Sequence, residues 1–134
     1  MPVVQEDPLL RAPRVPLATP DAPRSKELHL VDAEVEDPRV LTDAELLTAA
    51  ARGAVAAGGG HVLDEVLVRF PNGAVTLVLV LAESHLSLHT WPEERLVAVD
   101  LFSCGAIDAA RVVDELLRSL RLRRAAVRRV GRGA

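Results

Sequence analysis

The sequence has little of several residue types that define common protein classes. It contains one cysteine, one tryptophan, two phenylalanines and no tyrosine among 134 residues. One cysteine cannot form a disulfide within the chain, which favours a reducing compartment such as the cytoplasm. So few aromatic side chains give nucleic-acid bases no platform for stacking, and a net charge of −3 gives phosphates no general attraction. We therefore expect no nucleic-acid partner.

Long hydrophobic runs are also missing, although 49% of the residues are hydrophobic. No apolar stretch reaches the roughly 18 residues that cross a bilayer. The first residues lack the basic segment and apolar run of a secretory signal. We expect no membrane partner and a single domain, since this length can bury one core.

Proline is concentrated at one end of the chain, because six of the nine prolines lie within residues 1–25. Each proline fixes φ and removes a backbone N–H donor, so no regular element is expected there. We interpret residues 1–25 as a flexible, proline-rich arm and residues 26–134 as one folded domain.

Two helices and six strands are predicted from hydrophobic periodicity. The first helix opens at Thr42, which has the spacing of a capping box with Glu45, and ends at three glycines, Gly58 to Gly60. The second follows Asp108, a good helix cap, and carries apolar residues at i, i+3 and i+4. We predict strands over 27–36, 61–70, 75–81, 84–89, 96–102 and 124–130.

This order of elements predicts an α+β fold, a two-layer sandwich with an antiparallel sheet and helices on one face. The strand over 75–81 is almost continuously apolar, which predicts burial on both of its faces. Two helices can cover only one face of the sheet. We therefore expect a second copy of the chain to cover the other face in a homodimer.

Most of the reactive side chains lie in one stretch, residues 82–105, which reads AESHLSLHTWPEERLVAVDLFSCG. Two strands joined by a turn at Trp91 and Pro92 predict a hairpin that brings Ser84, His89 and Cys104 towards one end of the sheet. They are a possible nucleophile, base and acid. Taken alone, the serine and histidines would be the polar side of a half-exposed strand. His85 and His89 lack an obvious third ligand, so no metal is expected.

Two segments of this stretch, AESHLSLHTWPE and VDLFSCG, resemble the signature of the small prokaryotic S-adenosylmethionine decarboxylases. The spacing carries the resemblance, with His89 five positions and Cys104 twenty positions after Ser84. Weaker similarity extends over about residues 28–131. The resemblance implies a zymogen that cuts itself between Glu83 and Ser84. Its cofactor would be a pyruvoyl group made from Ser84, which forms a Schiff base with the substrate amine.

The resemblance also implies a role for each matching residue. Ser84 is the pyruvoyl precursor, His89 the base that assists processing, and Cys104 the proton donor to the substrate. Phe70 stacks on the adenine and Glu93 binds the ribose hydroxyls. Thr76 stands where the family often has a serine that supports processing, and it keeps the hydroxyl.

The activity implied is the decarboxylation of S-adenosylmethionine, a small-molecule substrate, to the aminopropyl donor of polyamine and spermidine synthesis. Two alternatives stay open. The scarcity of aromatic residues would also suit a pyruvoyl-dependent decarboxylase of a basic amino acid, arginine or ornithine. Thr76 and the arm would suit a non-catalytic homologue that regulates another subunit.

Overall fold

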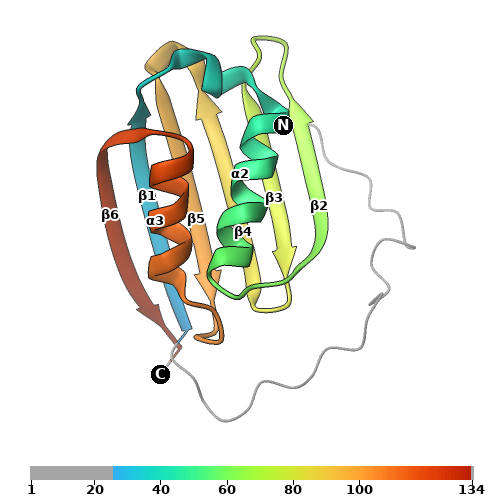
Figure 1. Cartoon of the computed structure of the whole chain (residues 1–134), viewed down its shortest axis with the longest axis vertical. Coiled ribbons are helices and arrows are strands. Elements are labelled where there is room, and N and C mark those ends of the chain that lie inside the picture. Colours follow the sequence, from blue (N-terminus) through green and yellow to red (C-terminus); the bar gives the residue numbers. More distant parts are fainter. Residues whose placement is uncertain (1–25, 134) are drawn as a thin grey trace.

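The computed structural model describes residues 26–133, so the predicted arm over 1–25 lies outside the described residues. Six strands form one antiparallel sheet in the order β2-β3-β4-β5-β1-β6. Both α-helices lie side by side on one face of this sheet (Figure 1), which confirms the predicted α+β sandwich. The elements are β1 (Lys26–Val35), η1 (Pro38–Thr42), α2 (Ala44–Ala57), β2 (Val62–Arg69), β3 (Val75–Leu81), β4 (Ser84–Trp91), η2 (Pro92–Glu94), β5 (Leu96–Ser103), α3 (Ala109–Ser119) and β6 (Leu122–Arg132).

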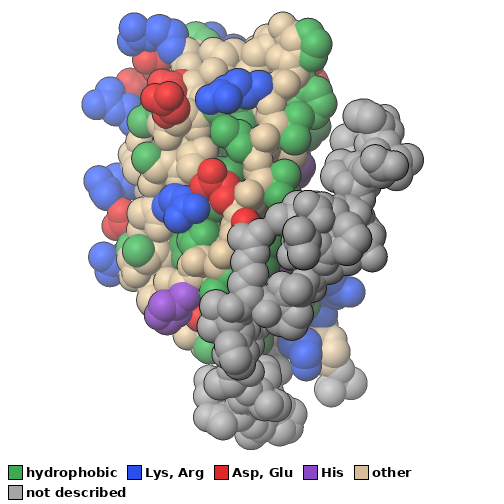
Figure 2. Space-filling model, turned by 90° about the vertical axis from the view of Figure 1, so that its right-hand side faces the viewer, with side chains coloured by type: hydrophobic (Ala, Val, Ile, Leu, Met, Phe, Trp, Pro, Cys, Tyr) green, Lys and Arg blue, Asp and Glu red, His purple; other side chains and the backbone are tan. Residues whose placement is uncertain are grey.

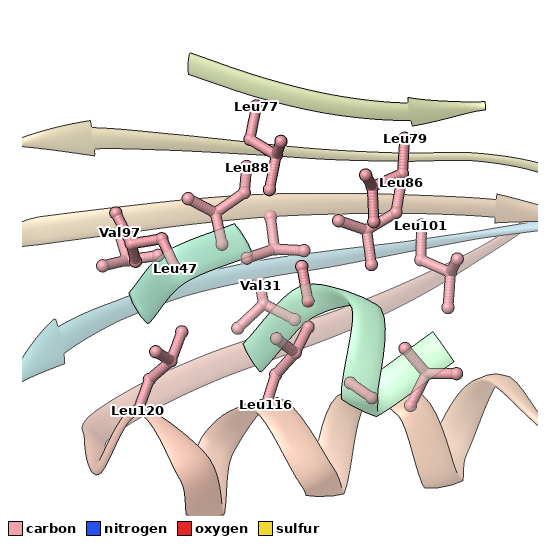
Figure 3. Close-up of a cluster of buried hydrophobic side chains, with 14 of the residues drawn as sticks. Val31, Leu47, Leu77, Leu79, Leu86, Leu88, Val97, Leu101, Leu116 and Leu120 are labelled. Carbon is pink, nitrogen blue, oxygen red and sulfur yellow. The ribbon is translucent and has the colours of Figure 1, made fainter. Parts of the chain in front are cut away.

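The hydrophobic core fills the space between the helices and the sheet (Figure 3). Leu47 on α2 and Leu116 on α3 face alternate residues of the central strands, among them Leu77 and Leu88. All four are almost completely buried. Burial of a leucine side chain stabilises a fold by roughly 1.5–3 kcal/mol, so this layer holds the central strands rigidly in place.

The first helix starts one residue later than predicted. Its N-cap is Asp43, whose carboxylate accepts a hydrogen bond from the Leu46 N–H at 3.0 Å. Thr42 is instead the last residue of η1, and its hydroxyl donates to the Arg39 carbonyl. Thr42 belongs to the short 3-10 helix η1, which begins at Pro38. The N-cap of α2 is therefore the next residue with a side-chain acceptor, Asp43.

Strand β3 is buried on one face only, so the prediction of burial on both faces is wrong for the single chain. Val75, Leu77, Leu79 and Leu81 are buried, whereas Val80 is 41% exposed. Residues of alternate parity point to the face away from the helices, which we call the open face. No element within 26–133 covers it. Figure 2 looks onto the β2 edge with the open face at its right, and hydrophobic side chains stand at the upper part of this margin.

The last strand is longer than predicted, because β6 pairs with β1 over almost its whole length. Its arginines therefore lie on an edge strand. Arg124 and Arg129 approach Glu34 and Glu27 of β1, each at 3.8 Å.

No helix within residues 26–133 is long and apolar enough to cross a membrane.

Candidate active site

The junction between Glu83 and Ser84 lies in a tight turn between β3 and β4. Leu81 pairs with Ser84, which leaves Ala82 and Glu83 as the two turn residues. Ser84 has a φ of 144°, a region that residues with a side chain rarely enter. Such a conformation costs on the order of 1–3 kcal/mol and persists only where the surroundings hold it. The strain therefore lies at the peptide bond that the family resemblance marks for cleavage.

Cys104 lies directly beside this junction. Ser103, the last residue of β5, pairs with Ser84, and the following residue is Cys104. The Cys104 N–H donates a hydrogen bond to the Glu83 carbonyl oxygen at 3.2 Å. Its thiol is free and partly exposed. Ser84 and Cys104 thus lie together at one end of the sheet, as the hairpin predicts.

His89 is not at that end, so this part of the prediction is wrong. It pairs with Thr76 on β3 and with Ala98 on β5, five residues along β4 from Ser84. At about 3.4 Å per residue, this places the two residues roughly 17 Å apart along the strand. Ser84 and His89 are five positions apart in the sequence, and an extended strand sets residues at this spacing much farther apart than a helix or a loop would.

His89 and Thr76 form a second group at the opposite end of the sheet. The Thr76 hydroxyl and His89 Nδ1 lie 3.0 Å apart and form a hydrogen bond. Trp91 lies next to His89, with 6.0 Å between the ring centroids. Both His89 and Trp91 have the parity of the open face, as has Thr76.

A pocket of about 610 Å³ surrounds this second group and brings four predicted site residues together. Phe70 and Glu93 line it beside Thr76 and His89. A pocket of this size suits a nucleoside-sized ligand. The residues that line it are Phe70, Pro71, Asn72, Ala74, Thr76, His89, Thr90, Trp91 and Glu93.

Two further residues contribute polar contacts that the sequence analysis missed. Asn72 Nδ2 donates to Glu93 Oε2 at 3.4 Å, while Asn72 Oδ1 accepts from the Ala74 N–H at 3.0 Å. The sequence Pro71-Asn72-Gly73 is typical of a turn, but it does not indicate this contact. His61 contacts the Glu83 side chain at the other end of the sheet, and no pattern in the sequence indicated it.

Comparison with known proteins places the chain in a family. Residues 27–133 match the family model described as S-adenosylmethionine decarboxylase. The chain belongs to this family.

No group of three or more histidine, cysteine, aspartate or glutamate residues within 26–133 could hold a metal ion.

Members of the S-adenosylmethionine decarboxylase family with known names and structures are similar over most of the chain. The S-adenosylmethionine decarboxylase proenzyme of Pyrococcus abyssi is 33% identical over 106 residues, which cover 78% of this chain and 76% of that protein. The proenzyme of Symbiobacterium thermophilum is 41% identical over 95 residues, covering 70% and 72%. The crystal structure of the adenosylmethionine decarboxylase from Aquifex aeolicus has a TM-score of 0.76 and 29% identity, with 84% and 94% covered.

Proposed function

We propose that the chain is a proenzyme that cuts its own Glu83–Ser84 bond and then decarboxylates S-adenosylmethionine, supplying the aminopropyl donor of polyamine synthesis. The observation that supports this proposal most strongly is the geometry of the junction between Glu83 and Ser84. There, a serine with a φ of 144° follows a carbonyl that accepts a hydrogen bond from the Cys104 N–H. Membership of the family and the names of the relatives support the substrate.

Self-cleavage at this junction needs only groups of the chain and water. Ser84 Oγ attacks the Glu83 carbonyl carbon, the C–N bond breaks, and the hydroxyl proton ends on the freed nitrogen, so an ester replaces the amide. The Cys104 N–H, 3.2 Å from the carbonyl oxygen, stabilises the charge that develops there. Loss of the Ser84 α-proton then expels Glu83 as a carboxylate. Water finally displaces ammonia and leaves a ketone at position 84.

The pyruvoyl group formed in this way supplies a carbonyl that condenses with the substrate amine and withdraws electrons as CO₂ leaves. Cys104 is the proposed donor of the proton that replaces the carboxylate, since its thiol can donate its S–H proton and lies beside the Glu83–Ser84 junction. In the pocket, Phe70 offers an aromatic face to the adenine. Glu93, with one oxygen held by Asn72, offers acceptors to the ribose hydroxyls.

We further propose that the active unit is a homodimer in which each site combines two chains. Within one chain, His89 and the pocket lie roughly 17 Å along β4 from Ser84, too far for proton transfer or for one substrate to touch both groups well. Two copies packed open face to open face, with their strands antiparallel, would bring the end of the sheet that holds the Glu83–Ser84 turn and Cys104 in one copy next to the pocket of the other.

The composition of the open face supports this packing. Val66 on β2 is 53% exposed and Val80 on β3 is 41% exposed, so both present apolar area to solvent in the single chain. In the assembled dimer, His89 and Thr76 of one copy would serve the Ser84 of its partner. His89 is then the proposed base for the elimination step, and the Thr76 hydroxyl orients its ring. We propose that the enzyme works in the cytoplasm.

Decarboxylation assays test the substrate. Matured protein is expected to release labelled CO₂ from S-adenosylmethionine and none above background from arginine or ornithine. The aromatic side chains and the carboxylate that line the pocket suit an adenine ring and ribose hydroxyls, which arginine and ornithine lack. The uncut Ser84→Ala variant is the matched control. Release from arginine or ornithine alone would reassign the substrate, and release from none of the three would favour a regulatory homologue.

A further inference from the structure

His61 binds the turn that contains the cut site through three hydrogen bonds. Its backbone carbonyl accepts from the Ala82 N–H at 2.9 Å. Its backbone N–H donates to Glu83 Oε1 at 2.9 Å, and its ring Nδ1 lies 3.0 Å from Glu83 Oε2. Because a carboxylate can only accept, the ring donates through Nδ1–H. His61 therefore contacts both residues of the turn.

The Glu83 carboxylate is held in a place where it needs these partners. The Glu83 side chain is only 9% exposed, whereas that of His61 is 74% exposed. Burying a carboxylate without donors is costly, so its two oxygens depend on the donors of His61. Gly60 lets the backbone come this close, because a Cβ there would lie 3.3 Å from Glu83 Oε1 and 2.5 Å from Ile107 Cδ1.

These contacts bear on self-cleavage because Glu83 provides the carbonyl that is attacked. The Cys104 N–H holds the Glu83 carbonyl oxygen, and His61 holds the other end of the same residue. Ser84 keeps its rare φ of 144° only if the turn cannot relax. With the Glu83 side chain released, the turn loses the contacts that fix the side-chain end of Glu83, and the geometry of attack is populated less.

We propose that His61 is a positioning residue for self-cleavage, which acts through the Glu83 side chain and holds the junction in its strained, attack-ready form. This inference rests on the proposed cleavage at Ser84. It assigns His61 no contact with the substrate or the reacting atoms. Its effect falls on the rate at which the full-length chain is cut.

The experiment follows cleavage of the freshly translated, full-length chain by denaturing gel electrophoresis. His61→Leu removes the ring donor and is expected to slow cleavage about tenfold, whereas His61→Asn places its Nδ2 donor where the ring has Nδ1 and should cut within about twofold of the wild type. Arg52→Leu is the matched control. It removes an exposed ion pair of similar length, Arg52 Nε to Glu65 Oε1 at 2.8 Å, between α2 and β2.

Rescue by asparagine separates positioning from a general loss of stability. Wild-type cleavage in His61→Leu, or equal slowing in the leucine and asparagine variants, would overturn the role of the ring donor. Equal slowing in Arg52→Leu would also overturn it, because the effect would then follow the loss of any surface contact. A wild-type chain that is never cut would refute the proposed function itself, and this inference with it.

Discussion

Ser84→Ala is expected to leave the protein as one uncut chain, however long it is incubated. Alanine has no oxygen to attack the Glu83 carbonyl, while its Cβ keeps the steric strain of the positive φ. The junction is then equally strained but has no nucleophile. Intact-mass analysis after days of incubation measures the result directly.

Ser87→Ala is the control for this experiment. Ser87 lies on the same strand, pairs with Val78 and Asp100, and is also partly buried. It should be cut as the wild type is. Two chains in the Ser84→Ala preparation would show that cleavage is hydrolysis by another route, and the proposed chemistry at Ser84 would fail.

Two inactive variants are expected to restore activity to each other when they share a dimer. Cys104→Ala should cut itself but lose most turnover, because it lacks the proposed proton donor. Glu93→Gln should also be cut and should lose affinity for the ribose. In a mixed dimer, the intact Cys104 of one chain would face the intact Glu93 of the other, and one complete site results.

Co-expression with two different affinity tags makes this test quantitative. Random pairing makes about half of the dimers mixed, and each has one intact site, so the unfractionated mixture should show about one quarter of the wild-type rate. Protein that carries both tags should show about half. A doubly tagged preparation that is as inactive as each parent variant would contradict the proposal that each site combines two chains. Activity would then give no reason for a homodimer.

The fold was largely predictable from the sequence because its signals are local. Strand β3 has the predicted bounds, and α3 begins after the predicted cap, where Asp108 accepts from the Arg111 N–H. Alternation and capping depend only on neighbouring residues. The predicted cap at Thr42 was wrong because this residue belongs to the neighbouring η1. The predicted burial of both faces of β3 was wrong for the single chain because no element within residues 26–133 covers the open face.

The site was less predictable, because its geometry depends on register and on contacts far apart in the sequence. The motif indicated Ser84, His89 and Cys104 together, yet the register of β4 separates His89 from the other two. The pair His61 and Glu83 is separated by 22 positions and belongs to no periodic pattern. Phe70 and Glu93 came only from the family resemblance, and the pocket brings them next to His89.

The most direct test of the central claim is the mass of the C-terminal fragment of matured wild-type protein, before and after treatment with borohydride in the presence of S-adenosylmethionine. We expect a chain of residues 84–134 that is lighter by one ammonia than the same chain with an N-terminal serine. After treatment it should carry the reduced adduct of the decarboxylated substrate. A fragment with a free N-terminal serine that resists every carbonyl reagent would contradict the account.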